Sequence, residues 1–347
     1  MPVVLGLMSG TSLDGLDLCC VSFSEDLQDF EILATDTILY NKNWQQQLEQ
    51  GFFSDTKTLK ALDVSYGAFI GQEVLRFVKD NNLGTIDLIA SHGHTIFHKP
   101  DKGITLQIGD GKQIAKLTQI PVVYDFRQAD VELGGQGAPL VPMGDAYLFG
   151  QYDACLNLGG FANISYTQNQ QILAFDICAC NLVLNRLANK MGMPYDNKGA
   201  AAEGGSFNTL LYKQLSTIDY YQQKAPKSLG REFVEDVLWP LIEHRTPSEG
   251  LHTYTQHVAQ QIGQTLEDIA VKSCLVTGGG AFNSYLIGQI QSHSQCEIYI
   301  PDERIISYKE ALVFALLGWL RYKGKNNVFA SVTGASHDHS TGRIAMP

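Results

Sequence analysis

The feature that most constrains the fold is a similar order of predicted elements in the two halves of the 347-residue chain. Each half opens with a β-strand, a polar loop of small residues and a second strand, in residues 3–23 and again in residues 154–166. Helices and further strands then follow in both halves, although no sequence repeat is legible. We therefore predict a duplicated α/β unit with lobes 1–150 and 151–331, and a ligand-binding cleft between them.

The predicted elements follow from apolar runs and from the spacing of apolar residues. In the first half, strands are expected at 3–8, 16–23, 30–39, 86–90 and 120–124, and helices within 44–79 and at 112–118. In the second half, strands are expected at 154–158, 164–166, 171–175, 274–277 and 297–300. Helices are expected there at 182–191, 207–215, 231–243, 253–271, 281–292 and 307–322. We expect the tail, residues 332–347, to pack back weakly onto the first lobe.

Composition and charge exclude several classes of protein. The chain has 25 Lys plus Arg against 36 Asp plus Glu, a net charge of −11, so binding to nucleic acid or an anionic membrane through charge is not expected. Seven cysteines, an odd number in mostly apolar runs, indicate a reducing compartment. No signal peptide is visible, and the longest apolar stretch, 311–320, is about half of a membrane span. We therefore expect a cytoplasmic protein.

The loop between the first two strands has residues suited to binding phosphate groups. Main-chain N–H groups around Gly10 and the hydroxyls of Thr11 and Ser12 can donate to an anion. Asp14 can hold Mg²⁺ directly or through water, and Asp17 follows in the next strand. An ordinary hairpin turn, in which these side chains cap main-chain groups, explains the same residues equally well.

Two further glycine turns lie in the second half of the chain. One is at the place that matches the first loop, and two such turns facing one cleft can grip a polyphosphate from both sides. The other has three glycines between a strand and a helix, where a phosphate or flat ligand can lie against the backbone. An ordinary tight turn needs only one glycine, and neither a Walker lysine nor the dinucleotide fingerprint is present. The candidate residues are Asn157, Gly159, Gly160, Gly278, Gly279, Gly280 and Asn283.

Polar side chains also follow predicted strands. Asp125 and Arg127 come after strand 120–124 and precede a glycine loop that contains Gln136, so they can hydrogen-bond a sugar or a carboxylate. An Asp–Arg surface pair in a flexible connection is the alternative. Asp176 follows strand 171–175, where a carboxylate can serve as a general base or can cap the next helix.

Histidines and cysteines raise the question of a metal site. His92, His94 and His98 are close in sequence, but no further ligand follows at a suitable spacing, so we favour His92 as a hydrogen-bonding group beside the cleft. Cys178 and Cys180 are two residues apart, which supplies only half of a zinc site.

Ten sequence blocks occur in one order along nearly the whole chain. They are GLMSGTSLDGLD (6–17), SHG (91–93), TLQIGD (105–110), DFR (125–127), GGQGAPLVP (134–142), NLGG (157–160), PYD (194–196), GGGAFN (278–283), EA (310–311) and VTGAS (332–336). With these blocks the chain resembles the anhydro-N-acetylmuramic acid kinases of the sugar kinase/actin/heat-shock-chaperone superfamily. The resemblance implies a duplicated actin-like, ribonuclease H-like ATPase fold with two lobes around a central cleft.

The resemblance also implies a reaction. Water cleaves the 1,6-anhydro bond of a small amino sugar, anhydro-N-acetylmuramic acid, while ATP with Mg²⁺ phosphorylates the freed 6-oxygen, a step of bacterial cell-wall recycling. Asp176 is then the base that activates the water, and residues 10–17 form the nucleotide loop. Arg127, Asp125 and Glu310 are then sugar contacts. A homodimer is a further expectation.

The chain departs from the family pattern directly after Asp176. The family usually continues with Thr-Gly-Pro-Gly-Asn, whereas residues 177–181 here are Ile-Cys-Ala-Cys-Asn. Side chains in place of glycines can fill space that a sugar needs. Three hypotheses therefore stay open. The protein turns over the anhydro sugar; it binds nucleotide or amino sugar without turnover, or phosphorylates another sugar; or Cys178 and Cys180 form a metal or redox site with a histidine.

Overall fold

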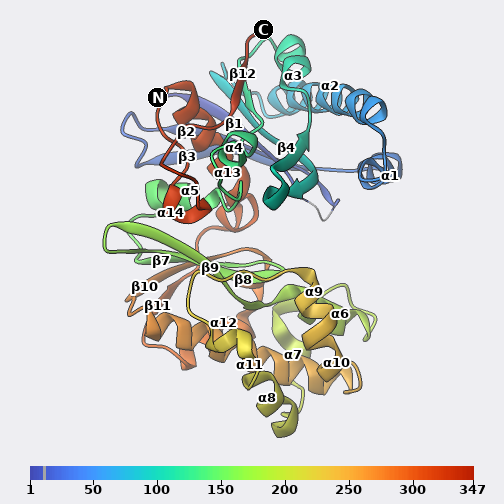
Figure 1. Cartoon of the computed structure of the whole chain (residues 1–347), viewed down its shortest axis with the longest axis vertical. Helices are drawn as coiled ribbons and strands as arrows, with labels where there is room; N and C mark the ends of the chain where they lie inside the picture. The colour runs from blue at the N-terminus through green and yellow to red at the C-terminus, as the bar shows by residue number, and fades with distance from the viewer. Residues whose placement is uncertain (11–12) are drawn as a thin grey trace. The chain divides into compact units, whose positions relative to one another are not determined.

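The computed structural model describes residues 1–10 and 13–347 (Figure 1). Thr11 and Ser12, which belong to the predicted phosphate loop, therefore lie outside the described residues. The chain divides into two compact units, one of residues 1–150 with 308–347 and one of residues 151–307. The second lobe was expected to extend to residue 331, but the chain from Tyr308 onward packs with the first unit.

The first unit is built on a seven-stranded sheet with β1 near its centre. On one side of β1, the strands β2 and β3 form an antiparallel meander; on the other side, β4 and β6 run parallel to β1. β5 pairs with β4, and β12 pairs with β6, both antiparallel. The strands are β1 (Val3–Ser9), β2 (Gly15–Phe23), β3 (Phe30–Leu39), β4 (Leu88–Lys99), β5 (Ile104–Ile108), β6 (Val122–Tyr124) and β12 (Arg343–Ala345).

Helices cover the first sheet. The helix α13 (Glu303–Tyr322), near the C-terminus, explains why this unit includes residues beyond 307. A Cβ atom at Gly6 of β1 would overlap the carbonyl oxygen of Ala311, so α13 lies directly against the strand. α2 and α3 pack together over the apolar core that contains Leu5 and Leu7 (Figure 1). The helices are α1 (Lys42–Gly51), α2 (Thr56–Asp80), α3 (Gly111–Thr118), α4 (Gln128–Glu132), α5 (Val141–Leu148), α13 (Glu303–Tyr322, in this unit from Tyr308 onward) and α14 (Ala330–Thr333).

The second unit repeats the strand order of the first in a five-stranded sheet. β7, β8 and β9 form the antiparallel meander, and β10 and β11 run parallel to β7 on its other side. The strands are β7 (Ala154–Leu158), β8 (Phe161–Gln168), β9 (Gln171–Ala179), β10 (Ser273–Thr277) and β11 (Glu297–Tyr299). The prediction of a duplicated, actin-like α/β fold is confirmed by this shared topology.

The helices of the second unit pack with one face of its sheet around a single apolar core. The predicted helix 231–243 is divided in three, because a π-helical turn, Val234–Leu238, separates α9 from α10. The helices are α6 (Asn181–Asn189), α7 (Ala200–Glu203), α8 (Thr209–Ser216), α9 (Arg231–Phe233), α10 (Trp239–Ile242), α11 (Pro247–Asp268) and α12 (Ser284–Ser292).

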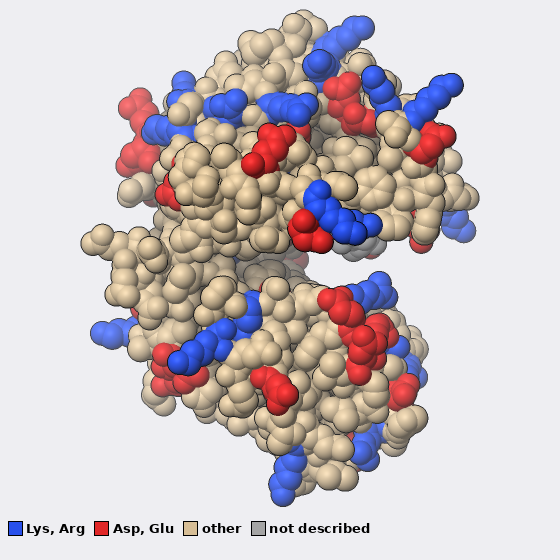
Figure 2. Space-filling model, viewed as in Figure 1, with Lys and Arg blue, Asp and Glu red and all other residues tan. Residues whose placement is uncertain are grey.

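Three further observations concern the helices, the surface charges and the C-terminal tail. In the described part of the chain, none of the helices has the length and apolar character needed to cross a bilayer. Basic and acidic side chains are interspersed on the face drawn in Figure 2. The tail is held firmly, because the buried Thr341 donates from Oγ1 to the carbonyl oxygen of Phe126 at 2.8 Å and β12 pairs with β6.

Candidate active site

Four polar residues of the second unit lie in one row across its sheet. Thr277 on β10 is in register with Asn157 on β7, which pairs with Asn163 on β8, which pairs with Asp176 on β9. Residues in register project to the same face of a sheet. Because Leu156 and its alternating neighbours face the helix-covered core, the polar row lies on the other face.

A β-bulge decides the face on which Asp176 projects. Ala162 pairs with Cys178 and Asn163 with Asp176, so Ile177 is an extra residue on β9. The bulge sends Cys178 into the core and Asp176 to the polar face. Asp176 was predicted to follow this strand, but it lies within β9. It does not cap the next helix either, because Cys180 precedes α6.

The carboxyl group of Asp176 is half-buried, so solvent reaches it. Burial raises its pKa, and a hydrogen bond from the Leu229 N–H to Oδ2, at 2.9 Å, acts in the opposite direction. A carboxylate with a raised pKa accepts a proton more readily near neutral pH. Its surroundings therefore suit a general base.

The residues that depart from the family pattern point away from Asp176. The side chains of residues 177–180 all belong to the buried core of the second unit. They therefore do not fill the polar face of the sheet. Burial also raises the pKa of the Cys180 thiol to about 12 and that of Cys178 well above its ordinary value, which opposes metal binding by thiolates. Within the described ranges, no three His, Cys, Asp or Glu side chains form a metal-binding group.

The two glycine turns of the second unit lie side by side. Gly278 has a φ of 79°, and a Cβ there would come within 2.5 Å of Asn157 Oδ1. Asn181 Nδ2 donates to the Leu158 carbonyl at 2.9 Å, and its side chain also lies beside Gly280. The fold therefore brings together the predicted residues Asn157, Gly159, Gly160, Gly278, Gly279 and Gly280. Asn283 has a structural task, because its Oδ1 caps α12 by accepting from the Leu286 N–H.

In the first unit, Arg127 is held by two hydrogen bonds. Its Nε donates to His92 Nε2 at 2.9 Å, and its Nη1 donates to the Gly137 carbonyl at 2.6 Å. Burial lowers the pKa of Arg127 to about 10, while the charges of Glu310 and Asp130 oppose that shift. Predicted residues His92, Arg127 and Glu310 thus lie together.

Asp17 is on the face of β2 that α13 covers. Burial raises its pKa, the Thr37 hydroxyl lowers it by donating to Oδ1 at 2.7 Å, and the nearby charge of Asp14 raises it again. Asp14 itself is exposed, and Gly10 directly follows β1.

Two further predicted residues have other partners. Asp125 Oδ2 forms an ion pair with Arg343 Nε at 3.0 Å, so its carboxylate is bound to the tail and not to Arg127. Gln136 is exposed, and its main-chain N–H donates to the Thr333 carbonyl at 2.8 Å. The other two histidines of the 92–98 group are hydrogen-bonded, His94 to the Ser9 hydroxyl and His98 to the Thr105 hydroxyl.

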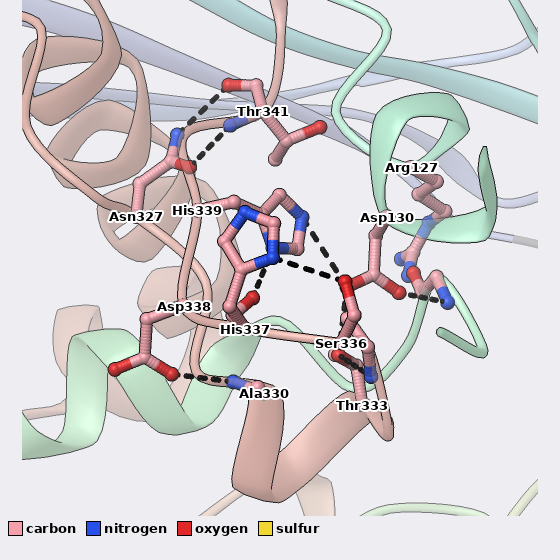
Figure 3. Close-up of polar contacts among 12 residues, drawn as sticks. Arg127, Asp130, Asn327, Ala330, Thr333, Ser336, His337, Asp338, His339 and Thr341 are labelled. Carbon is pink, nitrogen blue, oxygen red and sulfur yellow. Dashed lines mark hydrogen bonds and ion pairs between the residues drawn. The ribbon is translucent and has the colours of Figure 1, made fainter. Parts of the chain in front are cut away.

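The sequence reasoning missed the buried Asp130, which ties the tail to the glycine loop (Figure 3). Its Oδ2 accepts from the Gly137 N–H and its Oδ1 from the Thr333 hydroxyl, both at 2.6 Å. His339 Nε2 lies 3.4 Å from the same Oδ1. Because the Gly137 carbonyl also holds Arg127, this network supports the guanidinium. Its only local signal is an aspartate three residues after Arg127.

Comparisons with known proteins agree over the whole length. The model of the family "Anhydro-N-acetylmuramic acid kinase" matches residues 2–347. A curated protein of that name from Crocosphaera subtropica is 34% identical, with 99% of this chain and 98% of the relative covered. One from Shewanella loihica is 33% identical, with 98% and 97% covered.

Solved structures are more distant in sequence. The activator of the 2-hydroxyisocaproyl-CoA dehydratase from Clostridium difficile, with bound ADPNP, is 15% identical with a TM-score of 0.48, covering 92% of this chain and 96% of that one. A ROK family glucokinase from Streptomyces griseus, in complex with glucose and AMPPNP, is 11% identical with a TM-score of 0.43, covering 91% and 99%. On the family model and the curated relatives together, the chain belongs to the anhydro-N-acetylmuramic acid kinase family.

Proposed function

We propose that Asp176 is the base of an ATP-dependent kinase that opens 1,6-anhydro-N-acetylmuramic acid. Family membership makes the protein a kinase of this anhydro sugar, with a role in cell-wall recycling. ATP supplies the phosphoryl group for the 6-oxygen of the sugar, and the product is N-acetylmuramic acid 6-phosphate. The observation that carries the role of Asp176 is its half-buried carboxylate on the polar sheet face, in one row with Asn157.

Asp176 accepts the proton of the water that attacks the anomeric carbon. The Leu229 N–H holds Oδ2, which leaves Oδ1 to receive the proton. A raised pKa increases the driving force with which the carboxylate accepts this proton, and a base held in one position lowers the entropic cost of the transfer. Arg127 is suited to binding polar groups of the sugar, because its guanidinium is oriented before the sugar arrives. His92, Asp125, Gln136 and Glu310 are the other proposed sugar contacts.

Main-chain amides are proposed to bind the nucleotide. The turns at Asn157, Gly159 and Gly160 and at Gly278, Gly279 and Gly280 lie side by side, and Gly278 and Gly280 are where the two turns touch. At Gly279 the Cβ position is open apart from Asn181 Nδ2 at 3.9 Å, which leaves the backbone there accessible to a phosphate oxygen. Asn283 was also expected here, but its side-chain oxygen is engaged as a cap. In the first unit, we propose the same phosphate-binding role for Gly10, Thr11 and Ser12 of the loop between the first two strands.

Asp14 is the proposed ligand of Mg²⁺, because its carboxylate is exposed and carboxylate oxygens are the ligands that Mg²⁺ prefers. Asp17 is a proposed residue of the nucleotide loop, and the charge of Asp14 contributes to its raised pKa. A divalent cation at Asp14 would relieve this repulsion and would neutralise charge on the phosphates. We further propose that the enzyme works in the cytoplasm; a homodimer stays a prediction.

The alternative of binding without turnover rests on residues 177–180. Their burial in the core supports turnover instead, because they leave the face of Asp176 open. The test is to mix the enzyme with ATP, Mg²⁺ and the anhydro sugar and to measure ADP and the 6-phosphosugar. Asp176→Asn should lose at least about a hundredfold in kcat and keep its ATP affinity by calorimetry. Asp219→Asn, at an exposed aspartate, is the matched control. Normal turnover in Asp176→Asn would refute the role of the base.

A further inference from the structure

One short segment of the second unit, residues 220–229, holds three polar groups of Asp176. The Asp176 N–H donates to the Lys227 carbonyl at 3.1 Å. The Asp176 carbonyl accepts from the Tyr220 hydroxyl at 2.6 Å, and Oδ2 accepts from the Leu229 N–H at 2.9 Å. We infer that residues 220–229 are a positioning clamp for the base, and that Tyr220 and Leu229 are its main positioning residues. This inference rests on the proposed function of Asp176.

The position of Asp176 in the sheet explains why a clamp is needed. Among the described residues, β9 is the edge strand of its sheet and pairs only with β8. The neighbouring Ile177 is a bulge residue, and a bulge interrupts the ladder of hydrogen bonds. An edge strand beside a bulge is therefore poorly fixed by the sheet alone. The segment 220–229 supplies the hydrogen bonds that a further strand would otherwise provide.

The clamp is braced by its own contacts. Lys227 Nζ donates to the Tyr220 carbonyl at 3.2 Å and lies 4.7 Å from the centroid of the Tyr220 ring. It also lies 5.9 Å from the ring of Phe175, the residue before Asp176. The Tyr220 ring is buried and packs 5.3 Å from Phe233. These contacts join the two ends of the segment, so the Tyr220 hydroxyl and the Leu229 N–H are held together.

The electrostatics around the carboxylate are simple. Burial raises the pKa of Tyr220 and of Cys178, which keeps both neutral near pH 7. Lys227, whose Nζ lies over the rings of Tyr220 and Phe175, has a pKa that burial lowers. The Leu229 N–H is the donor that favours the ionised form of Asp176. Loss of this donor should therefore shift the titration of the base to higher pH.

The first experiment compares two neighbouring tyrosines. Tyr220→Phe removes the hydroxyl that holds the Asp176 carbonyl and keeps the ring. We expect kcat to fall about twofold to tenfold, as for one neutral hydrogen bond, with the KM values for ATP and sugar unchanged. Tyr221→Phe is the matched control, because Tyr221 makes none of the three bonds to Asp176 and its buried hydroxyl has no hydrogen-bond partner among the described residues. Equal kcat values for the two variants would overturn the role of Tyr220.

The second experiment removes the main-chain donor. Leu229→Pro has no N–H to offer to Oδ2, so the acid limb of the kcat/KM profile should move to higher pH. A merely structural role of Leu229 predicts a lower rate with no such movement. If Leu229→Pro fails to bind ATP in calorimetry and so is misfolded, the pH profile of Tyr220→Phe takes its place. The acid limb of Tyr220→Phe should also move up, because the carboxylate is no longer held at the donor, and an unmoved limb would count against the clamp.

Asp176→Asn separates the clamp from the proposed function. Full turnover in Asp176→Asn shows that this residue is not the base, whatever the tyrosine variants do. Lost turnover in Asp176→Asn, combined with wild-type kinetics in Tyr220→Phe, refutes the clamp alone. When both positions matter, Tyr220→Phe should have no further effect on the residual rate in the Asp176→Asn background, because the hydroxyl acts through the carboxylate.

Discussion

The Nε–H group of Arg127 donates to His92 Nε2 at 2.9 Å, and this bond determines the tautomer of the histidine. A guanidinium only donates, so Nε2 is the nitrogen without a proton. Nδ1 then carries the proton and donates to the Gly93 carbonyl at 2.9 Å. Burial, together with the charge of Arg127, keeps the pKa of His92 well below its ordinary value. The neutral imidazole therefore holds the guanidinium in one place throughout the neutral pH range.

The first prediction concerns this acceptor. His92→Phe keeps the aromatic packing against Phe314, 4.7 Å away, and removes the nitrogen that receives Arg127. We expect the KM for the sugar to rise about fivefold to tenfold, because a hydrogen bond of a charged donor is lost, with a smaller change in kcat. His92→Gln offers an acceptor again and should restore part of the affinity. Steady-state kinetics check this, and an unchanged KM in His92→Phe would contradict it.

The second prediction concerns the triple-glycine turn. In the described part of the chain, a Cβ at Gly279 would meet only Asn181 Nδ2, 3.9 Å away, so Gly279→Ala fits the folded protein. If the turn binds phosphate groups, the added methyl group should raise the Kd for ATP at least about tenfold by blocking the approach to the backbone, while the melting temperature stays the same. Gly288→Ala is the control, because no described atom outside the local backbone of α12 lies within 4 Å of its Cβ position. Equal ATP affinity in both variants, measured by calorimetry, would remove Gly279 from the nucleotide site.

Local signals predicted much of the fold. The strand at 30–39 has the predicted bounds, and the hairpin of β1 and β2 differs by one residue at its turn. Such elements depend on neighbours in sequence, namely apolar alternation and glycine turns. The glycine turns were found for the same reason. Their roles in binding stay predictions.

Contacts between distant segments could not be predicted. The face on which Asp176 projects depends on the bulge at Ile177. This bulge exists because the pairing register of β8 and β9 shifts there. The bond from Thr333 to Asp130 spans 203 residues. The boundary expected at 331 fell instead at 307, because α13 packs on Gly6 at the other end of the chain. No local pattern carries these relations.

The third prediction concerns Asp130 and its network. Asp130→Asn replaces a fully buried acceptor with an amide, whose NH₂ group can face only one of the two donors, Gly137 N–H and Thr333 Oγ1. We expect a loss of about 2–4 kcal/mol in the free energy of unfolding and a higher KM for the sugar, because the Gly137 carbonyl no longer holds Arg127. Thr333→Val removes one donor and should cost about 1 kcal/mol. Urea unfolding and kinetics test this, and equal losses in the two variants would argue against Asp130 as the centre of the network.

The fourth prediction concerns His257, a buried residue of α11 that lies among the rings of Tyr212, Tyr221 and Tyr254. Neither of its ring nitrogens has a hydrogen-bond partner in residues 1–10 and 13–347. Burial of these polar atoms costs free energy, so His257→Phe should stabilise the protein by roughly 1–3 kcal/mol at pH 7.5. His244→Phe, at a side chain that is 82% exposed, is the control.

The gain from His257→Phe should grow as the pH falls. Burial lowers the pKa of His257 to about 3, whereas an unfolded histidine titrates near 6.5. Between these values the unfolded chain binds a proton that the folded protein does not, so stability falls with falling pH through this group. Removing the histidine removes that loss, which is up to about 1.4 kcal/mol for each pH unit below 6.5. Urea unfolding at pH 7.5 and 5.0 should therefore show a larger gain at pH 5.0, and an equal gain at both would mean that His257 is not held in its neutral form.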